Sequence, residues 1–140
     1  KIKMDGVSLT PLSQIHHPKG DIFHIMKASD DSFFGFGEAY LTTIRTNEVK
    51  GWKKHSNMTL NLVVLSGEVK FVVYNMSHKM FYSAELSLNN YQRLTVCPGY
   101  WVAFKGVGES NMILNLANIE HDPKESVNLD LNAIDYVWQA

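Results

Sequence analysis

The sequence predicts an all-β domain in which short strands close into a sandwich or a barrel. Turn signals, for example Ser66-Gly67 and Pro98-Gly99, recur at short intervals along the 140 residues. The segments between them are rich in β-branched and aromatic residues. Many short strands with frequent turns are typical of sandwiches and barrels. No linker or repeat interrupts the chain, so we expect one domain over residues 1–140.

The clearest strands are expected at residues 21–27, 38–45, 60–65, 68–75, 91–97 and 112–116. The segments on either side of Ser66-Gly67 predict a tight hairpin. In the last strand, Met112, Leu114 and Leu116 share one face. Residues 119–140 are polar with scattered apolar anchors, so we expect them to form a C-terminal arm that wraps along the barrel.

Composition and charge exclude several classes of function. The formal net charge is −1, which argues against a nucleic-acid partner and against a membrane surface. No apolar run reaches the length of a membrane span, and residues 1–5 lead into no apolar signal segment. Cys97 is the single cysteine, so no disulfide forms within the chain, which fits a cytoplasmic location.

Several motifs occur in an order that resembles a known family. Residues 49–55 read Val-Lys-Gly-Trp-Lys-Lys-His, and residues 61–69 read Asn-Leu-Val-Val-Leu-Ser-Gly-Glu-Val. An early Lys19-Gly20 with Phe23, the turn Pro98-Gly99-Tyr100, and the tail over residues 118–138 continue the match. In this order they resemble the dTDP-4-dehydrorhamnose 3,5-epimerase family, of which the chain looks like a short, divergent member.

This resemblance implies a cupin-like jelly-roll β-barrel that binds a nucleotide-linked keto-sugar. The implied reaction is epimerisation or isomerisation of a dTDP-linked 4-keto-6-deoxy sugar, in bacterial surface-polysaccharide synthesis. A proton would be removed next to the ketone, without a cofactor. The family's usual assembly implies a homodimer. It also implies that Lys19 and Phe23 contact the nucleotide, and that Glu38 lies among the residues that grip the ligand.

The sequence departs from that family at the positions that carry its chemistry. Lys53 stands where the family has its catalytic histidine, Val102 replaces a later histidine, and Leu114 falls near the place of the catalytic tyrosine. A non-catalytic cupin that binds a sugar nucleotide is therefore an alternative. Of the four ligands of a metal-binding cupin only His55 remains, so we expect no metal.

Lys53 and His55 are two residues apart, so on a strand they face the same side. Histidine is suited to remove a proton near neutral pH, and lysine to stabilise an enolate or act as the base itself. Tyr40, which shares a face with Glu38 and Thr42, is a candidate acid or hydrogen-bond donor. The alternatives are a solvated basic turn around His55 and an outward polar face around Tyr40.

Further candidates come from the positions of polar and aromatic residues. Lys50 can pair with a phosphate, and Asn61 and Tyr74 are candidates for the cavity wall. One of Trp52, Tyr100 and Trp101 is a candidate to stack on a nucleotide base, but packing in the core or at a dimer interface is the commoner fate of such aromatic residues.

Overall fold

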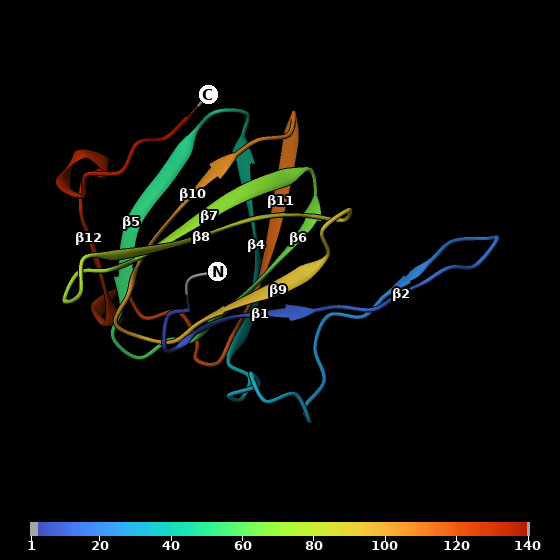
Figure 1. Ribbon diagram of the computed structural model, residues 1–140. Coiled ribbons are helices and arrows are strands. Elements are labelled where there is room, and N and C mark those ends of the chain that lie inside the picture. Colours follow the sequence, from blue (N-terminus) through green and yellow to red (C-terminus); the bar gives the residue numbers. More distant parts are fainter. Residues whose placement is uncertain (1–2, 140) are drawn as a thin grey trace.

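The computed structural model describes residues 3–139, so the first two residues and the last residue of the expected domain and arm lie outside it. In the described residues the fold is two five-stranded antiparallel sheets that face each other, with a separate two-stranded hairpin (Figure 1). Two short 3-10 turns are the only helical elements in residues 3–139. The predicted all-β barrel is confirmed.

The first sheet contains, in spatial order, β1 (Val7–Pro11), β9 (Gln92–Val96), β6 (Leu60–Ser66), β11 (Ser110–Ala117) and β4 (Glu38–Arg45). The second sheet contains β12 (Ser126–Asn128), β5 (Val49–His55), β10 (Trp101–Gly106), β7 (Glu68–Asn75) and β8 (Met80–Ser87). The hairpin is β2 (Gln14–Ile15) with β3 (Ile22–Phe23), and the 3-10 turns are η1 (Pro123–Glu125) and η2 (Leu131–Ala133). Within residues 3–139, no helix has the length and apolarity needed to cross a membrane.

The main core lies between the inner faces of the two sheets. Alternate residues of β6, such as Leu62 and Val64, meet alternate residues of β7, such as Phe71 and Val73. Leu94 of β9 joins them and is fully buried. This is the period-two alternation expected of strands with one face on a shared core.

The hairpin expected at Ser66-Gly67 is wrong, because the two strands belong to opposite sheets. β6 pairs with β9 and β11, whereas β7 pairs with β10 and β8. Gly67 carries the chain between the sheets with a φ of +79°, and a Cβ there would lie 2.2 Å from the Ser110 carbonyl oxygen. The two strands turn their apolar residues toward each other from opposite sides of the core, whereas adjacent strands of one hairpin would lie on the same side.

The strand expected at residues 21–27 is also shorter than predicted. Only Ile22 and Phe23 pair, within the β2–β3 hairpin that projects from the barrel (Figure 1). The following loop returns over the outer face of the first sheet, where Arg93 is fully buried. The Arg93 guanidinium donates hydrogen bonds to the Ile25 carbonyl and to Asp30 and Ser32. These bonds hold the loop on the sheet.

The segment after η1 covers the outer face of the second sheet. Trp52 and Trp101 form a second buried cluster there with Ile134, and Tyr136 and Trp138 pack against it. The Trp52 indole donates a hydrogen bond to the Leu131 carbonyl at 3.2 Å. Of the two alternatives for the tryptophans, the structure therefore shows packing.

Candidate functional site

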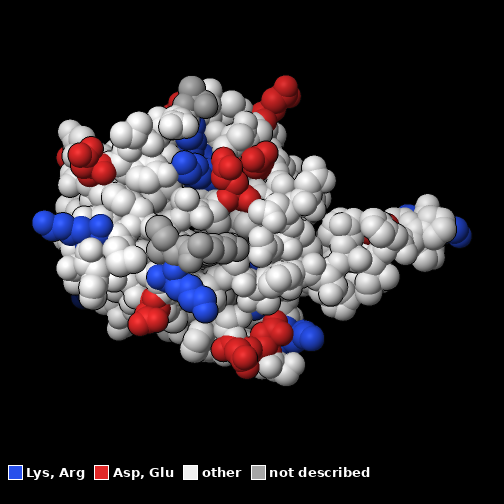
Figure 2. Space-filling model, in the orientation of Figure 1, with Lys and Arg blue, Asp and Glu red and all other residues white. Residues whose placement is uncertain are grey.

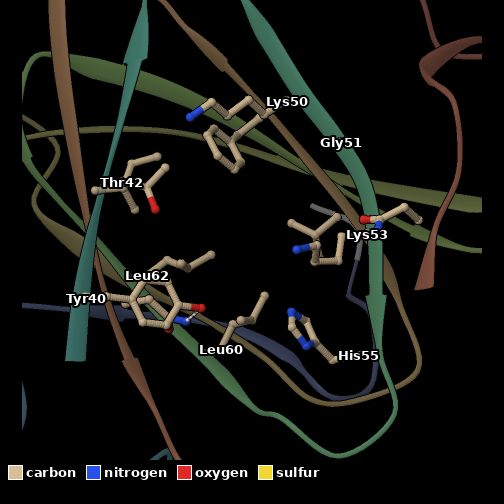
Figure 3. A pocket seen from close by; sticks show the side chains of 13 residues that line it. Tyr40, Thr42, Lys50, Gly51, Lys53, His55, Leu60 and Leu62 are labelled. Atoms are coloured by element: carbon tan, nitrogen blue, oxygen red, sulfur yellow. Dashed lines mark hydrogen bonds between the residues drawn. The ribbon is translucent and has the colours of Figure 1, made fainter. Parts of the chain in front are cut away.

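A cavity of about 280 Å³ lies between the two sheets. It is lined by Tyr40, Thr42, Lys50, Gly51, Lys53, His55, Leu60, Leu62, Val102, Phe104, Ile113, Asn115 and Asn128. Figure 3 shows Tyr40 on β4 and His55 on β5 pointing into it from opposite sides. The cavity therefore brings Tyr40, Lys50, Lys53 and His55 together from the set of residues predicted to form the site.

Most of the apolar lining and most of the polar lining come from different strands, although β11 supplies both Ile113 and Asn115. The inner strands β6 and β10, and Ile113 of β11, supply apolar side chains, because they pass through the middle of the two sheets. β4 is the outermost strand of its sheet, and β5 is next to the outermost strand of the other. These two strands supply the tyrosine, both lysines and the histidine. The cavity thus has an apolar floor and a polar rim.

An irregularity in β5 places three basic residues on one face. Phe104 pairs with Lys50 and Val102 pairs with Lys53, so β5 has one residue more than β10 over this stretch. Such a bulge shifts the alternation of side chains, and Lys50 and Lys53 consequently face the same way. Gly51 has a φ of +150°, and a Cβ there would lie 2.4 Å from that of Ala103, so glycine fits this position.

His55 is held by a buried carboxylate from the C-terminal segment. Its Nδ1 is hydrogen bonded to Oε1 of Glu125, a residue that is only 6% exposed. The other oxygen of Glu125 accepts hydrogen bonds from the amides of Asn57 (3.0 Å) and Met58 (3.1 Å). Because an ionised carboxylate can only accept, Nδ1 of His55 carries the proton of this bond. In the neutral ring, Nε2 is then an acceptor.

The hydrogen bonds to Glu125 decide its charge state. Burial alone would raise the pKa of this carboxyl, but the bonds from His55 and from the amides of Asn57 and Met58 lower it, and the net pKa lies below the ordinary value. Glu125 is therefore ionised at neutral pH. An ionised partner stabilises the imidazolium that forms when His55 accepts a proton.

Tyr40 is oriented by an amide on the neighbouring strand. Oδ1 of Asn115 accepts a hydrogen bond from the backbone N–H of Asn61 at 3.0 Å. This leaves Nδ2 of Asn115 to donate to the Tyr40 hydroxyl at 2.9 Å. The hydroxyl proton has only a weak acceptor nearby, the sulfur of Met58 at 3.8 Å. Tyr40 can therefore donate a hydrogen bond to a ligand in the cavity.

The two lysines supply positive charge to the same space. Lys53 lies on β5 between β12 and β10, where it pairs with Asn128 and Val102. Lys50 donates a hydrogen bond to the Thr43 carbonyl at 2.8 Å and so connects β5 to β4 at the rim. Lys54 faces the other side of the sheet, where its ammonium group lies 5.1 Å from the centre of the Trp101 ring.

The structure does not bring the other five predicted residues to this cavity. Asn61 and Tyr74 were expected on its wall, but both side chains point away from it. The Asn61 amide oxygen accepts hydrogen bonds from Arg93 and Thr95 on the outer face of the first sheet. The Tyr74 ring packs on Phe81, with ring centres 4.4 Å apart, in the outer aromatic layer of the second sheet.

The remaining three lie outside the cavity as well. Lys19 and Phe23 belong to the projecting hairpin, where Phe23 contacts the edge of the Tyr91 ring. Glu38 accepts a hydrogen bond from the His121 amide at 2.9 Å. Contacts of these three residues with a ligand stay a prediction.

Three residues of the site were not predicted from the sequence. Glu125 follows an Asp-Pro turn and carries no signal of its partner, which is 70 residues away in the chain. Asn115 shares one face of β11 with Ile113, but the opposite face of this strand, with Met112, Leu114 and Leu116, is the more apolar one in the sequence. Asn128 lies in the arm, where only apolar anchors were noted. Among the described residues, no three His, Cys, Asp or Glu side chains come together as a metal site would require.

Comparisons with known proteins identify relatives of this fold. The family model described as "FdtA: WxcM-like, C-terminal" matches residues 5–133. No curated protein matches the chain. A solved structure of a dTDP sugar isomerase from Desulfovibrio desulfuricans has a TM-score of 0.89 and 27% identity, and the match covers 96% of this chain and 91% of that one.

Two further solved structures show the same fold at lower identity. A mutant of the 3,4-ketoisomerase QdtA from Thermoanaerobacterium thermosaccharolyticum, in complex with TDP-4-keto-6-deoxyglucose, has a TM-score of 0.78 and 21% identity over 89% of this chain and 88% of that one. The rmlC epimerase of Mycobacterium tuberculosis has a TM-score of 0.84 and 12% identity over 94% and 72%. The expected likeness to sugar-nucleotide epimerases is confirmed in the fold. Since the family model spans nearly the whole chain, this protein belongs to the FdtA family of WxcM-like C-terminal domains.

Proposed function

We propose that this protein isomerises or epimerises a dTDP-linked 4-keto-6-deoxy sugar by moving a proton next to the ketone. The observation that carries the proposal is His55, hydrogen bonded to the buried Glu125 behind it, facing Tyr40 across one cavity (Figure 3). The fold is shared with the solved dTDP sugar isomerase, the 3,4-ketoisomerase in complex with TDP-4-keto-6-deoxyglucose and the rmlC epimerase. As the resemblance implies, we place the reaction in the cytoplasm, in the synthesis of bacterial surface polysaccharide.

His55 is the proposed base. Its Nδ1 carries a proton and donates it in a hydrogen bond to Glu125. Nε2 is therefore the nitrogen that can accept a proton from a carbon next to the ketone. The carbon–hydrogen bond gives its electron pair to the neighbouring carbonyl, whose oxygen becomes an enolate. The buried Glu125 carboxylate stabilises the imidazolium formed in this step.

Tyr40 and Lys53 are the proposed stabilisers of the enolate. The Tyr40 hydroxyl already accepts a bond from Asn115, and it can move its own proton from the weak Met58 sulfur acceptor to the developing oxyanion. Lys53 lines the same cavity and adds a positive charge. Return of the proton to the same carbon from the other side gives an epimer. Alternatively, the former ketone carbon is protonated. The hydroxyl on the deprotonated carbon then passes its proton to the enolate oxygen and becomes the new ketone.

The proposal is tested by exchange in deuterated water with dTDP-4-keto-6-deoxyglucose. The expected result is deuterium at a carbon next to the ketone, with the product identified by NMR. Product stereochemistry and ketone position then separate epimerisation from isomerisation. Binding of the sugar nucleotide without any carbon-bound exchange would instead support the non-catalytic alternative.

We also propose that the protein acts as a homodimer. The β2–β3 hairpin projects from the barrel with few charged side chains along it (Figure 2), and Ile15 and Ile22 are 49% and 57% exposed. An isolated two-stranded hairpin is marginally stable in water. A second copy that covers the hairpin would bury these side chains. Light scattering should give twice the chain mass, and Ile22→Lys should shift the protein toward monomer; a monomeric wild type would contradict the proposal.

A further inference from the structure

The short strand β12 contributes more to the cavity than the carboxylate that precedes it. It pairs antiparallel with β5, the strand that carries Lys53 and His55 (Figure 3). Asn128 lies directly opposite Lys53, and Ser126 lies directly opposite His55. Side chains of residues that lie opposite each other in an antiparallel pair are on the same face of the sheet. β12 therefore extends the cavity wall on which the proposed base lies.

The side chain of Asn128 is on the cavity side of β12. It lines the cavity together with Lys53. The residue before it, Val127, lies opposite Lys54, whose ammonium group is beside Trp101 on the other face of the second sheet. Alternation along the strand thus agrees with the lining, since Val127 faces away from the cavity and Asn128 faces it.

Asn128 is the polar neighbour of Lys53 within the sheet. On the other side of Lys53 lies Val102 of β10, whose side chain forms no hydrogen bonds. The Lys53 ammonium group can only donate hydrogen bonds, whereas the Asn128 carboxamide can both donate and accept. The Cβ atoms of such a cross-strand pair are about 4.5–5.5 Å apart, so the two polar ends can reach neighbouring oxygen atoms of one ligand.

The proposed substrate carries two such oxygen atoms. The ketone at C4 and the hydroxyl at C3 are on adjacent carbons of the sugar ring, and C5 on the other side of the ketone has no hydroxyl. The ketone oxygen only accepts hydrogen bonds and becomes an enolate in the proposed reaction, which suits the ammonium group of Lys53. A hydroxyl both donates and accepts, which suits the carboxamide of Asn128.

We infer that Asn128 is a further substrate-binding residue and that it recognises the hydroxyl next to the ketone. This inference rests on the proposed function and gives the C-terminal arm a direct contact with the sugar. Residues 125–128 then supply both the carboxylate that orients His55 and the amide that orients the substrate. Loss of one hydrogen bond between uncharged groups should lower kcat/KM by roughly three- to tenfold.

The test compares two sugars by the rate of deuterium exchange next to the ketone, in the wild type and in Asn128→Ala. The sugars are dTDP-4-keto-6-deoxyglucose and its 3-deoxy counterpart, dTDP-4-keto-3,6-dideoxyglucose. The variant should lose roughly three- to tenfold in kcat/KM for the first sugar and less than about twofold for the second, which has no hydroxyl for Asn128 to bind. The ratio of the two losses is the readout, because it cancels the different acidity of the two sugars.

Val127→Ala is the matched control. Val127 is the neighbouring residue of the same strand, and its side chain is 52% exposed on the other face of the sheet. The substitution also places an alanine on β12, so it should disturb the strand to a similar extent and leave the ratio unchanged. Equal losses for both sugars in Asn128→Ala, no loss for either, or the same change of ratio in Val127→Ala would overturn the inference.

Binding measurements keep this inference separate from the proposed function. If neither sugar exchanges a carbon-bound proton, the proposed reaction fails, and calorimetry can still measure the Kd of both sugars. Asn128→Ala should weaken the binding of the 3-hydroxy sugar by roughly three- to tenfold and that of the 3-deoxy sugar by less than about twofold. Equal weakening for the two sugars, or none, would reject the contact between Asn128 and the hydroxyl.

Discussion

The two walls of the cavity orient their polar groups with partners of different charge. On the β5 wall, the imidazole of His55 is fixed by Glu125, an ionised carboxylate that can only accept. On the β4 wall, the hydroxyl of Tyr40 is fixed by the neutral amide of Asn115, which donates to it. Glu125 leaves Nε2 of His55 as an acceptor toward the cavity, and Asn115 leaves the hydroxyl of Tyr40 as a donor. The buried partner thus sets the direction in which each wall can move a proton.

Removal of the acceptor on the β5 wall should have the largest effect. His55→Asn keeps a polar side chain but loses the base, and positioned bases contribute about 10²–10⁴-fold to proton transfer. The rate of deuterium exchange next to the ketone should fall by that factor, while dTDP binding changes little. Lys54→Gln is the control, since Lys54 lies on the other face of the same strand. A His55 variant with wild-type exchange would show that the β5 wall is not the acceptor.

Removal of the charge behind His55 should have the next largest effect. Glu125→Gln keeps the shape, but its amide can donate to Nδ1 and so favour the wrong tautomer of the imidazole. The comparable change in a serine protease triad costs about 10⁴-fold in kcat, and we expect at least about tenfold here. Steady-state kinetics should show the loss in kcat rather than in KM. NMR of the His55 ring nitrogens should show a changed tautomer, which a merely structural role for Glu125 would not produce.

The same substitution should change how stability depends on pH. The folded-state pKa of Glu125 lies below its ordinary value, so its ionised form stabilises the fold. This contribution is complete above the pKa of an unfolded glutamate, about 4.3, and is lost as the pH falls through the lower folded-state pKa. At pH 7, Glu125→Gln should lower the free energy of unfolding by about 1–3 kcal/mol.

Urea titrations at pH 7, 5 and 3 should measure that difference between wild type and variant. The gap in unfolding free energy should be narrower at pH 3 than at pH 5, because pH 3 lies below the pKa of an unfolded glutamate and the contribution of Glu125 falls from there downward. Asp21 and Asp30 also have pKa values lowered by hydrogen bonds from backbone amides, so their ionised forms contribute to the pH dependence in both proteins. The difference between the two proteins removes their contribution. A gap that stays constant with pH would mean that the charge of Glu125 does not stabilise the fold.

The residues of the two cavity walls could be predicted from the sequence, but the buried partners that orient them could not. Lys53, His55 and Tyr40 could be predicted because the alternation of side chains along a strand depends only on nearby residues. The strand that carries Tyr40, β4, also spans the expected residues 38–45. Glu125 could not be inferred, since its contact with His55 depends on how the C-terminal segment reaches the edge of β5. Asn115 was hidden for another reason. Met112, Leu114 and Leu116 make one face of β11 look like the core face, whereas the buried face carries Asn111, Ile113, Asn115 and Ala117.

Removal of the donor on the β4 wall should reduce the exchange rate least, because Lys53 also stabilises negative charge in the cavity. Tyr40→Phe removes the hydroxyl and leaves the ring. The exchange rate should fall by about tenfold, less than the roughly 10²–10³-fold typical for the loss of one oxyanion donor, because Lys53 remains. Asn115→Leu keeps the tyrosine but removes the bond that orients it, so it should cost less than Tyr40→Phe. If the two walls act as proposed, the double variant should lose no more than Tyr40→Phe alone, because Asn115 acts only through Tyr40. Fully additive losses would show that Asn115 contacts the ligand itself, and that this side of the cavity holds two independent donors, one on β4 and one on β11.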